Sequence, residues 1–252
     1  MNRYPYVSER EDFMSKEKLI RVAPSILSGD FGCLADSARR AEQAGADALH
    51  IDIMDGHFVP NLTLGPRAVA SIRRATKLFL DVHLMMYNPF DYIERFVEAG
   101  ANRITFHLEA TENVEDTLSF IKRCNVEAGL AFCPETSLSV IPKYLNKCDL
   151  ILIMTVHPGF GGQAFIPDTL EKVRFTRDLC NQLRIRKSGV ALKDEDAIDS
   201  IPPFDIQVDG GINAKTASEC IAAGANVLVS GSYLYEAKDM KQAILSLKGL
   251  SS

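Results

Sequence analysis

The chain repeats one pattern from Leu19 to its end, in which a short apolar run is followed by a longer segment of helical periodicity, and eight rounds can be counted. The apolar runs lie near residues 20–25, 48–54, 78–85, 103–108, 127–132, 150–156, 205–209 and 226–230. The helical segments lie near residues 31–44, 66–76, 90–99, 113–124, 137–146, 168–181, 214–223 and 238–248. Strands that alternate with helices are typical of a parallel sheet covered by helices. Eight rounds therefore predict a single (β/α)8 TIM barrel.

A nearly identical tetrapeptide returns the chain from helix to strand in three of these rounds. The copies are Ala44-Gly45-Ala46-Asp47, Ala99-Gly100-Ala101-Asn102 and Ala223-Gly224-Ala225-Asn226. Glycine just after a helix can adopt the left-handed conformation that ends it, so each copy predicts a helix stop followed by a buried strand. The alternative is a doubly wound open sheet, but no Gly-x-Gly-x-x-Gly follows the first strand and nothing marks a switch point. The barrel is therefore favoured.

Composition limits the number of domains and the kinds of partner. With 252 residues, 46% hydrophobic and 24% charged, the chain suits one barrel domain over residues 20–252, preceded by a polar extension of mixed charge over residues 1–19. A net charge of −5 without a long basic block gives no reason to expect nucleic acid, and no apolar run approaches the ~18 residues of a membrane span. Six cysteines without Cys-x-x-Cys spacing, and no recognisable signal peptide, predict reduced thiols and a cytoplasmic protein.

Four possible metal ligands lie at the carboxyl ends of the expected strands, where barrel enzymes have their active sites. They are His50, Asp52, His83 and Asp209. Two imidazoles and two carboxylates suit Zn²⁺, Fe²⁺, Mn²⁺ or Co²⁺. Around one divalent ion they leave no net charge, so such a site can be buried. The alternative is a polar network without an ion.

Three glycine clusters end neighbouring strands and predict a phosphate site. They are Gly159-Phe160-Gly161-Gly162, Gly210-Gly211 and Gly231-Ser232. Glycines let backbone N–H groups converge on an anion, and barrels frequently bind phosphate in the loops after the seventh and eighth strands. Tight turns use the same residues, so any one cluster alone is weak support for a phosphate site.

Seven motifs over about residues 20–248 resemble, in order and spacing, those of the ribulose-phosphate 3-epimerase family. They are Ala23-Pro24-Ser25-Ile26-Leu27, His50 to Asn61, His83-Leu84-Met85, Phe106-His107-Leu108-Glu109-Ala110, Met154 to Gln163, Val208-Asp209-Gly210-Gly211-Ile212 and Val229-Ser230-Gly231-Ser232. The resemblance implies interconversion of D-ribulose 5-phosphate and D-xylulose 5-phosphate in the pentose phosphate pathway. The expected partner is thus a small pentulose phosphate, and we also expect a homo-oligomer.

The resemblance also implies a role for each site residue. Asp52 and Asp209 exchange the proton, and the residues that hold one divalent metal ion are His50, Asp52, His83 and Asp209. A hydrophobic cap over the reacting carbons is formed by Met54, Met85 and Met154, although methionines at such positions are more often core residues. The residues expected to bind substrate are Ser25, His83, Gly159, Phe160, Gly161, Gly162, Asp209, Gly210, Gly211, Gly231 and Ser232.

Epimerisation at carbon 3 explains why two carboxylates are needed. A proton must leave the carbon beside the carbon 2 ketone, and one must return to the opposite face of a planar enediolate, which is simplest with two bases. The second and seventh strands are well separated round a ring of eight, so Asp52 and Asp209 would approach a central substrate from different directions. A metal ion acting as a Lewis acid would stabilise the enediolate.

One departure from the resembling family and two alternative functions remain. Residues 182–204 form a longer and more charged connection than the resembling family usually has, which we expect at the bottom of the barrel, away from the chemistry. A related sugar phosphate enzyme, such as an allulose-6-phosphate 3-epimerase or a hexulose-phosphate synthase, would use a similar site. A non-catalytic phosphosugar-binding protein is the alternative from a different class. His107 and His157 are expected to support the site or the fold rather than to ligate.

Overall fold

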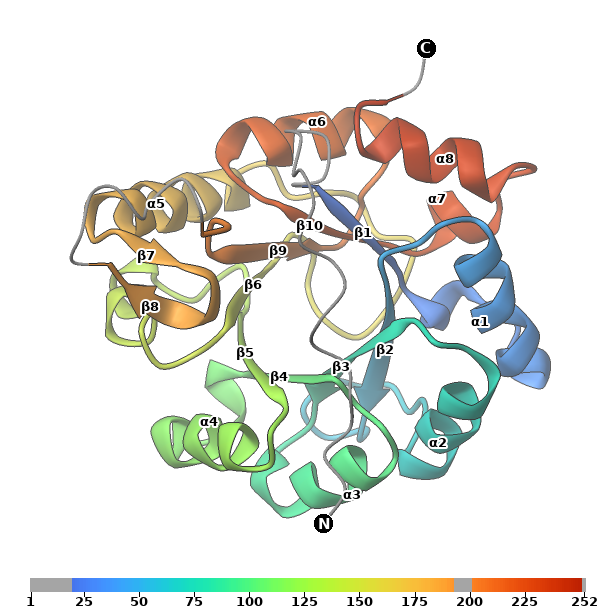
Figure 1. The fold of residues 1–252 in the computed structure, drawn as a ribbon, viewed down its shortest axis with the longest axis horizontal. Coiled ribbons are helices and arrows are strands. Elements are labelled where there is room, and N and C mark those ends of the chain that lie inside the picture. Colours follow the sequence, from blue (N-terminus) through green and yellow to red (C-terminus); the bar gives the residue numbers. More distant parts are fainter. Residues whose placement is uncertain (1–19, 193–200, 251–252) are drawn as a thin grey trace.

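The computed structural model describes residues 20–192 and 201–250, in which eight parallel strands form one barrel surrounded by helices (Figure 1). The strands are β1 (Arg21–Pro24), β2 (Ala48–Met54), β3 (Phe79–Met85), β4 (Arg103–His107), β5 (Glu127–Phe132), β6 (Leu150–Met154), β9 (Asp205–Asp209) and β10 (Val227–Ser230). Their order is β1-β10-β9-β6-β5-β4-β3-β2, and a parallel bridge between Ser25 and His50 joins the two ends of that order. The predicted (β/α)8 barrel is confirmed.

Helices on the outside fill most of the predicted positions. They are α1 (Leu34–Gln43), α2 (Pro66–Ala75), α3 (Ile93–Glu98), α4 (Val114–Arg123), α5 (Thr169–Gln182), α6 (Ala214–Ala223) and α8 (Met240–Leu247). The prediction of a helix over 137–146 was wrong in type, because that segment is a 3-10 helix, η6 (Leu138–Lys143). Pro142 lies inside it and has no N–H to donate to an α-helical ladder. A short helix, α7 (Ser232–Tyr235), was not predicted.

The repeated tetrapeptides hydrogen-bond to the neighbouring strand at the amino-terminal end of the barrel. Their glycines have the expected positive φ angles, 83° at Gly45, 98° at Gly100 and 112° at Gly224. The side chain of the last residue in each copy accepts a hydrogen bond from the backbone N–H of one residue in the preceding barrel strand. Its own backbone N–H donates to the carbonyl of that same strand residue. These pairs are Asp47 with Val22, Asn102 with Leu80 and Asn226 with Ile206, and Asp149 holds Ala128 in the same way.

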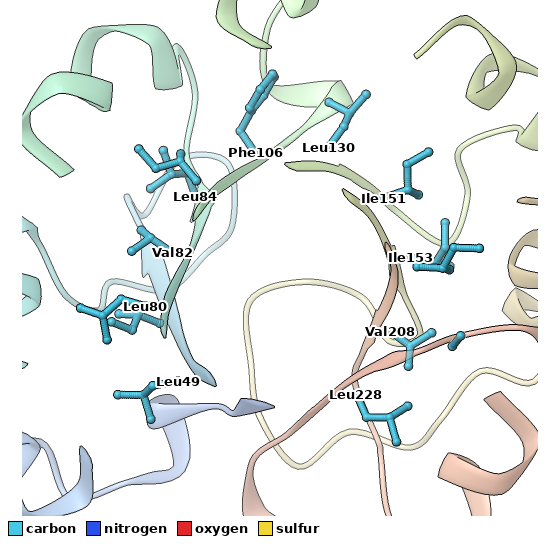
Figure 2. Close-up of a cluster of buried hydrophobic side chains, with 14 of the residues drawn as sticks. Leu49, Leu80, Val82, Leu84, Phe106, Leu130, Ile151, Ile153, Val208 and Leu228 are labelled. Carbon is cyan, nitrogen blue, oxygen red and sulfur yellow. The ribbon is translucent and has the colours of Figure 1, made fainter. Parts of the chain in front are cut away.

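The apolar core lies between the barrel and its helices. Figure 2 shows side chains on the outward face of the strands, and the labelled ones are Leu49, Leu80, Val82, Leu84, Phe106, Leu130, Ile151, Ile153, Val208 and Leu228. Each of these is fully buried. Because strand side chains alternate between the two faces, the residues between them point into the barrel. The outward face thus supplies hydrophobic stability and leaves the inward face available for polar groups.

The inward face is charged near the amino-terminal ends of the strands. Arg103 is only 3% exposed, and its guanidinium lies 2.6 Å from Glu127 Oε2, 3.5 Å from Asp205 Oδ2 and 3.6 Å from Asp81 Oδ1. Arg21 also pairs with Asp205. Burial lowers the pKa of Arg103, but the three carboxylates outweigh it and raise that pKa above its usual value. One buried cation therefore holds three carboxylates in place.

The long connection after α5 contains an antiparallel pair of two-residue strands, β7 (Ile185–Arg186) and β8 (Val190–Ala191), which was not predicted. Residues 193–200 of that connection and the expected extension over residues 1–19 lie outside the described residues. Over the part of the chain that the structure describes, none of the helices has the length and apolar character needed to cross a membrane.

Replacing Arg103 by Met should lower the free energy of unfolding by about 3–5 kcal/mol, because Asp81 and Asp205 would be left as buried charges without this cation. Urea unfolding measures the change. The matched control is Arg39→Met, since Arg39 pairs with Asp36 on the surface and its side chain is 51% exposed, and a loss of about 1 kcal/mol or less is expected there. Equal stability of the two variants would contradict this role of Arg103.

Candidate active site

A cavity of about 380 Å³ opens at the carboxyl ends of the barrel strands. The residues named from the sequence that line it are Ser25, Asp52, Met54, Met85, Met154, Gly159, Phe160, Gly161, Gly162, Asp209, Gly210, Gly211, Gly231 and Ser232. His50 and His83 are fully buried and do not line the cavity. The structure therefore brings all the predicted site residues to one end of the barrel.

The four predicted ligands form one cluster. His50 and Asp52 come from β2, His83 from β3 and Asp209 from β9. Nε2 of His50 lies 3.3 Å from Nδ1 of His83, 3.4 Å from Asp52 Oδ1 and 3.6 Å from Asp209 Oδ2. Nδ1 of His83 lies 3.2 Å from Asp52 Oδ1 and 3.9 Å from Asp209 Oδ2. Four donor atoms on three strands thus converge on one point.

These distances and donor types fit a divalent transition metal. A tetrahedral shell with bonds of about 2.1 Å separates neighbouring ligand atoms by about 3.4 Å, which is within the observed range of 3.2 to 3.9 Å. Two imidazole nitrogens and two carboxylate oxygens are ligands that Zn²⁺, Fe²⁺, Mn²⁺ and Co²⁺ share. The His50, Asp52, His83 and Asp209 cluster can therefore hold one such ion.

A neighbouring carboxylate orients His50. Its Nδ1 donates to Asp81 Oδ2 at 2.9 Å, so Nε2 faces the cluster, and the same Asp81 oxygen accepts from Gln207 Nε2 at 2.6 Å. A carboxylate behind a histidine commonly fixes the orientation of a metal-binding imidazole. Neither Asp81 nor Gln207 was predicted from the sequence. The available signal was alternation, because Asp81 lies two residues before His83 and so shares its face of β3.

The two carboxylates of the cluster have opposite electrostatic environments. Burial raises the pKa of Asp52, but the His50 and His83 rings outweigh burial and hold that pKa well below its usual range. Burial and the negative charge of Asp52 raise the pKa of Asp209 to about 7. Burial lowers the pKa of His50, but Asp52 and Asp81 outweigh it and raise this pKa well above its usual value. Asp52 is thus ionised near neutral pH, whereas Asp209 retains a proton much more readily than Asp52.

Ser25 and the methionines complete the wall of the cavity. The Ser25 hydroxyl donates to Asp52 Oδ2 at 2.5 Å, which holds one oxygen of that carboxylate. Met54, Met85 and Met154 are 4%, 2% and 2% exposed, so they present a dry surface next to the carboxylates. Ser28 also lines the cavity and was not predicted from the sequence.

The glycine clusters differ in how strictly they need glycine. Gly211 has a φ of +66°, and a Cβ atom there would lie 2.7 Å from the backbone nitrogen of Phe165, so a side chain would strain the loop. At Gly161 the nearest atom to a Cβ would be Ser28 Oγ at 3.8 Å, and a side chain would fit. Among the glycines of the three clusters, only Gly211 therefore shows a close approach to other backbone atoms, while Gly161 is of interest because it lines the cavity.

A loop contact closes one side of the cavity. Asn61, after β2, donates from Nδ2 to the Gly159 carbonyl, after β6, at 2.8 Å. Asp55 accepts hydrogen bonds from the backbone of His57, Phe58 and Tyr87, which ties this loop to the end of β3. His157 also lines the cavity, but it is exposed and pairs with Glu135 at 2.8 Å, outside the ligand cluster.

Fold and site together define a (β/α)8-barrel enzyme, with a buried cluster of possible metal ligands at the carboxyl ends of its strands. The model of the ribulose-phosphate 3 epimerase family matches residues 21–235. The chain therefore belongs to the ribulose-phosphate 3-epimerase family of carbohydrate isomerases.

Individual relatives agree with this membership. A ribulose-phosphate 3-epimerase from Chlamydia pneumoniae is 48% identical, with 94% of this chain and 97% of the relative covered. One from Bacillus subtilis is 43% identical, with 92% and 99% covered. Among solved structures, KGPDC from Streptococcus mutans shares the fold, with a TM-score of 0.65 over 92% of this chain and 97% of that chain, at 14% identity.

The affinity of the cluster for Co²⁺ should fall as the pH is lowered from 7 to 6. His50 and Asp209 have raised pKa values, so both are protonated on the acid side, whereas His50 Nε2 and the Asp209 oxygen that faces the cluster must carry no proton when they ligate. We expect the Kd of Co²⁺ to rise at least about tenfold over that unit, measured by chelator competition after metal removal. Glu236→Gln, in an acid that lines the cavity outside the cluster, should show the same profile. A Kd that is constant between pH 6 and 8 would contradict the ligand assignment.

Proposed function

We propose that the chain interconverts D-ribulose 5-phosphate and D-xylulose 5-phosphate by moving a proton at carbon 3, with one divalent metal ion in the site. Family membership and the names of the relatives support the choice of substrate. The observation that carries the mechanism is the pair Asp52 and Asp209, which meet in one cluster with pKa values shifted in opposite directions. Two carboxyl groups separated in this way can act as base and acid at the same pH.

The proton transfers follow from the positions of the two strands. Asp52, as a carboxylate, removes the carbon 3 proton of one epimer, and Asp209, as a carboxylic acid, returns a proton to the other face of the enediolate. The roles exchange in the reverse direction. β2 and β9 are separated in the ring by β1 and β10, so the two carboxyl groups reach the cavity from different directions. When bound, the metal ion supplies Lewis-acid stabilisation of the charge that develops on the substrate oxygens.

Several neighbouring groups support this chemistry. Ser25 holds one Asp52 oxygen, which leaves the other directed at the histidines. The methionine surface keeps water away from the enediolate and so protects it from unselective protonation. The glycine loops after β6, β9 and β10 line the same cavity and are suited to the phosphate, because glycine allows backbone N–H groups to approach an anion closely. Phosphate binding would hold carbon 3 between the carboxylates.

Other functions are less well supported. An allulose-6-phosphate 3-epimerase or a hexulose-phosphate synthase would use similar enediolate chemistry, but identities of 43% and 48% to proteins named ribulose-phosphate 3-epimerase favour the five-carbon substrate. A non-catalytic phosphosugar-binding protein would have no need of two carboxyl groups with opposite pKa shifts. Both Asp52 and Asp209 line the cavity, which favours catalysis.

Asp52→Asn and Asp209→Asn should each lower kcat for epimerisation of ribulose 5-phosphate by about 10³-fold or more, because each loses a proton carrier. A coupled assay of xylulose 5-phosphate measures the change, with metal content and thermal unfolding recorded for every variant. The matched control is Asp116→Asn on the exposed face of α4, which should keep wild-type turnover. Retention of more than roughly a tenth of wild-type turnover in either site variant, at full metal occupancy, would contradict the two-carboxylate mechanism.

A further inference from the structure

A second polar cluster lies behind His83, on the side away from the four-ligand cluster. It consists of His107 at the end of β4, Glu109 and Cys133. The His107 ring is fully buried and stacks on His83, with centroids 5.0 Å apart. The Nε2 atoms of His83 and His107 are 2.9 Å apart. At that distance one of these two nitrogens carries a proton and the other accepts it.

Glu109 decides which of the two nitrogens is the donor. Its Oε2 lies 3.3 Å from His107 Nδ1. Burial raises the pKa of Glu109, but hydrogen bonds from His107 and Thr136 outweigh burial and lower it to about 2, so Glu109 is a carboxylate and can only accept. His107 must then carry its proton on Nδ1. Its Nε2 is left to accept from His83 Nε2–H, and His83 Nδ1 keeps its lone pair for the four-ligand cluster.

This arrangement matters because Asp52 favours the opposite tautomer of His83. Asp52 Oδ1 lies 3.2 Å from His83 Nδ1 and would attract a proton to that nitrogen. A proton on Nδ1 would remove the lone pair that faces the cluster, and His83 could no longer ligate through it. Glu109, acting through His107, opposes that preference.

The carboxyl group of Glu109 is held in one orientation. Its Oε1 accepts the backbone N–H of Cys133 at 2.9 Å and the hydroxyl of Thr136. An amide in the same place would keep its oxygen at these two donors and present its NH₂ group to His107 Nδ1. That nitrogen would then have to accept a hydrogen bond. The directions of the Glu109–His107 and His107–His83 hydrogen bonds would both reverse.

Cys133 does not take over this role. Its Sγ lies 3.4 Å from His107 Nδ1, but burial and the charge of Glu109 raise the pKa of its thiol, which therefore stays protonated at neutral pH. A neutral thiol is a weak acceptor and a poor metal ligand. The carboxylate of Glu109 is the stronger acceptor for the His107 proton.

We propose that Glu109 is a positioning residue that sets the tautomer of His83 through His107, and thereby makes His83 Nδ1 available as a metal ligand. The inference rests on the proposed function for its use, because it assumes that His83 ligates the ion. The hydrogen-bond direction itself belongs to the protein and can be measured without metal.

The experiment compares Glu109→Gln, Glu109→Ala and the control Glu112→Gln, an exposed acid three residues further on. The ¹⁵N shifts of His83 and His107 are recorded in metal-free protein, and the affinity for Co²⁺ is measured by chelator competition, with thermal unfolding alongside. Wild type and Glu112→Gln should have His83 protonated on Nε2. Glu109→Gln should move that proton to Nδ1 and weaken Co²⁺ binding about 10- to 100-fold, as for other groups that orient metal ligands.

The comparison of Co²⁺ affinity between Glu109→Gln and Glu109→Ala distinguishes a positioning role of Glu109 from a structural one. Glu109→Ala lets water accept the His107 proton, so Co²⁺ affinity should fall less than in Glu109→Gln, although Ala loses the contacts to Cys133 and Thr136. A larger loss in Ala than in Gln, an unchanged His83 tautomer in Gln, or a second Co²⁺ bound with a thiolate absorption band would overturn the proposal. If wild type binds no Co²⁺, the ligand assignment fails. The ¹⁵N shifts still show the direction of the hydrogen bonds that link Glu109, His107 and His83.

Discussion

The structure depends on pairing every charge inside a closed barrel, where an isolated ion would be very costly. Arg103 neutralises Asp81 near the amino-terminal ends of the strands, Asp81 orients His50, and His50 contacts Asp52 in the four-ligand cluster. This line of contacts runs along the barrel interior from the buried cation to the cavity. The arginine at one end thereby helps to set the geometry of the site at the other.

The same constraint makes the two carboxylates unequal. Asp52 has two imidazoles and the Ser25 hydroxyl around it, so its charge is well stabilised. Asp209 is 16% exposed at the side chain and lies further from both imidazoles, with Asp52 as a like charge nearby. Difference in partners, rather than difference in residue type, shifts the pKa values of the two carboxyl groups in opposite directions. The barrel supplies that difference by placing the two residues on strands with different neighbours.

Much of the fold could be predicted from the sequence because it depends on local periodicity. The sequence shows eight rounds of strand and helix through the periodicity of its apolar residues. It also shows glycines that end helices, such as Gly100. The helix expected over 137–146 was wrong in type because Pro142 breaks its hydrogen-bond pattern, and β7 and β8 are too short to show a period.

The candidate ligands were also visible, since they lie at strand ends. The roles of Asp81, Gln207 and Glu109 were not, because they depend on pairing across strands. His50 lies beside Asp81 in the β2–β3 register, and Gln207 reaches Asp81 from β9 across the barrel interior. Such contacts join residues as many as 126 positions apart. Alternation along β3 places Asp81 on the same face as His83, but no local pattern indicates that Asp81 meets His50 and Gln207.

Proton exchange in heavy water tests most directly whether Asp52 and Asp209 serve opposite faces of carbon 3. Each metal-loaded Asp→Asn variant is incubated with ribulose 5-phosphate and, separately, with xylulose 5-phosphate, and loss of the carbon 3 proton is followed by NMR. A variant that keeps one base should exchange the proton of one epimer without converting it, and the two variants should exchange opposite epimers. Exchange of the same epimer by both variants would contradict the two-carboxylate mechanism.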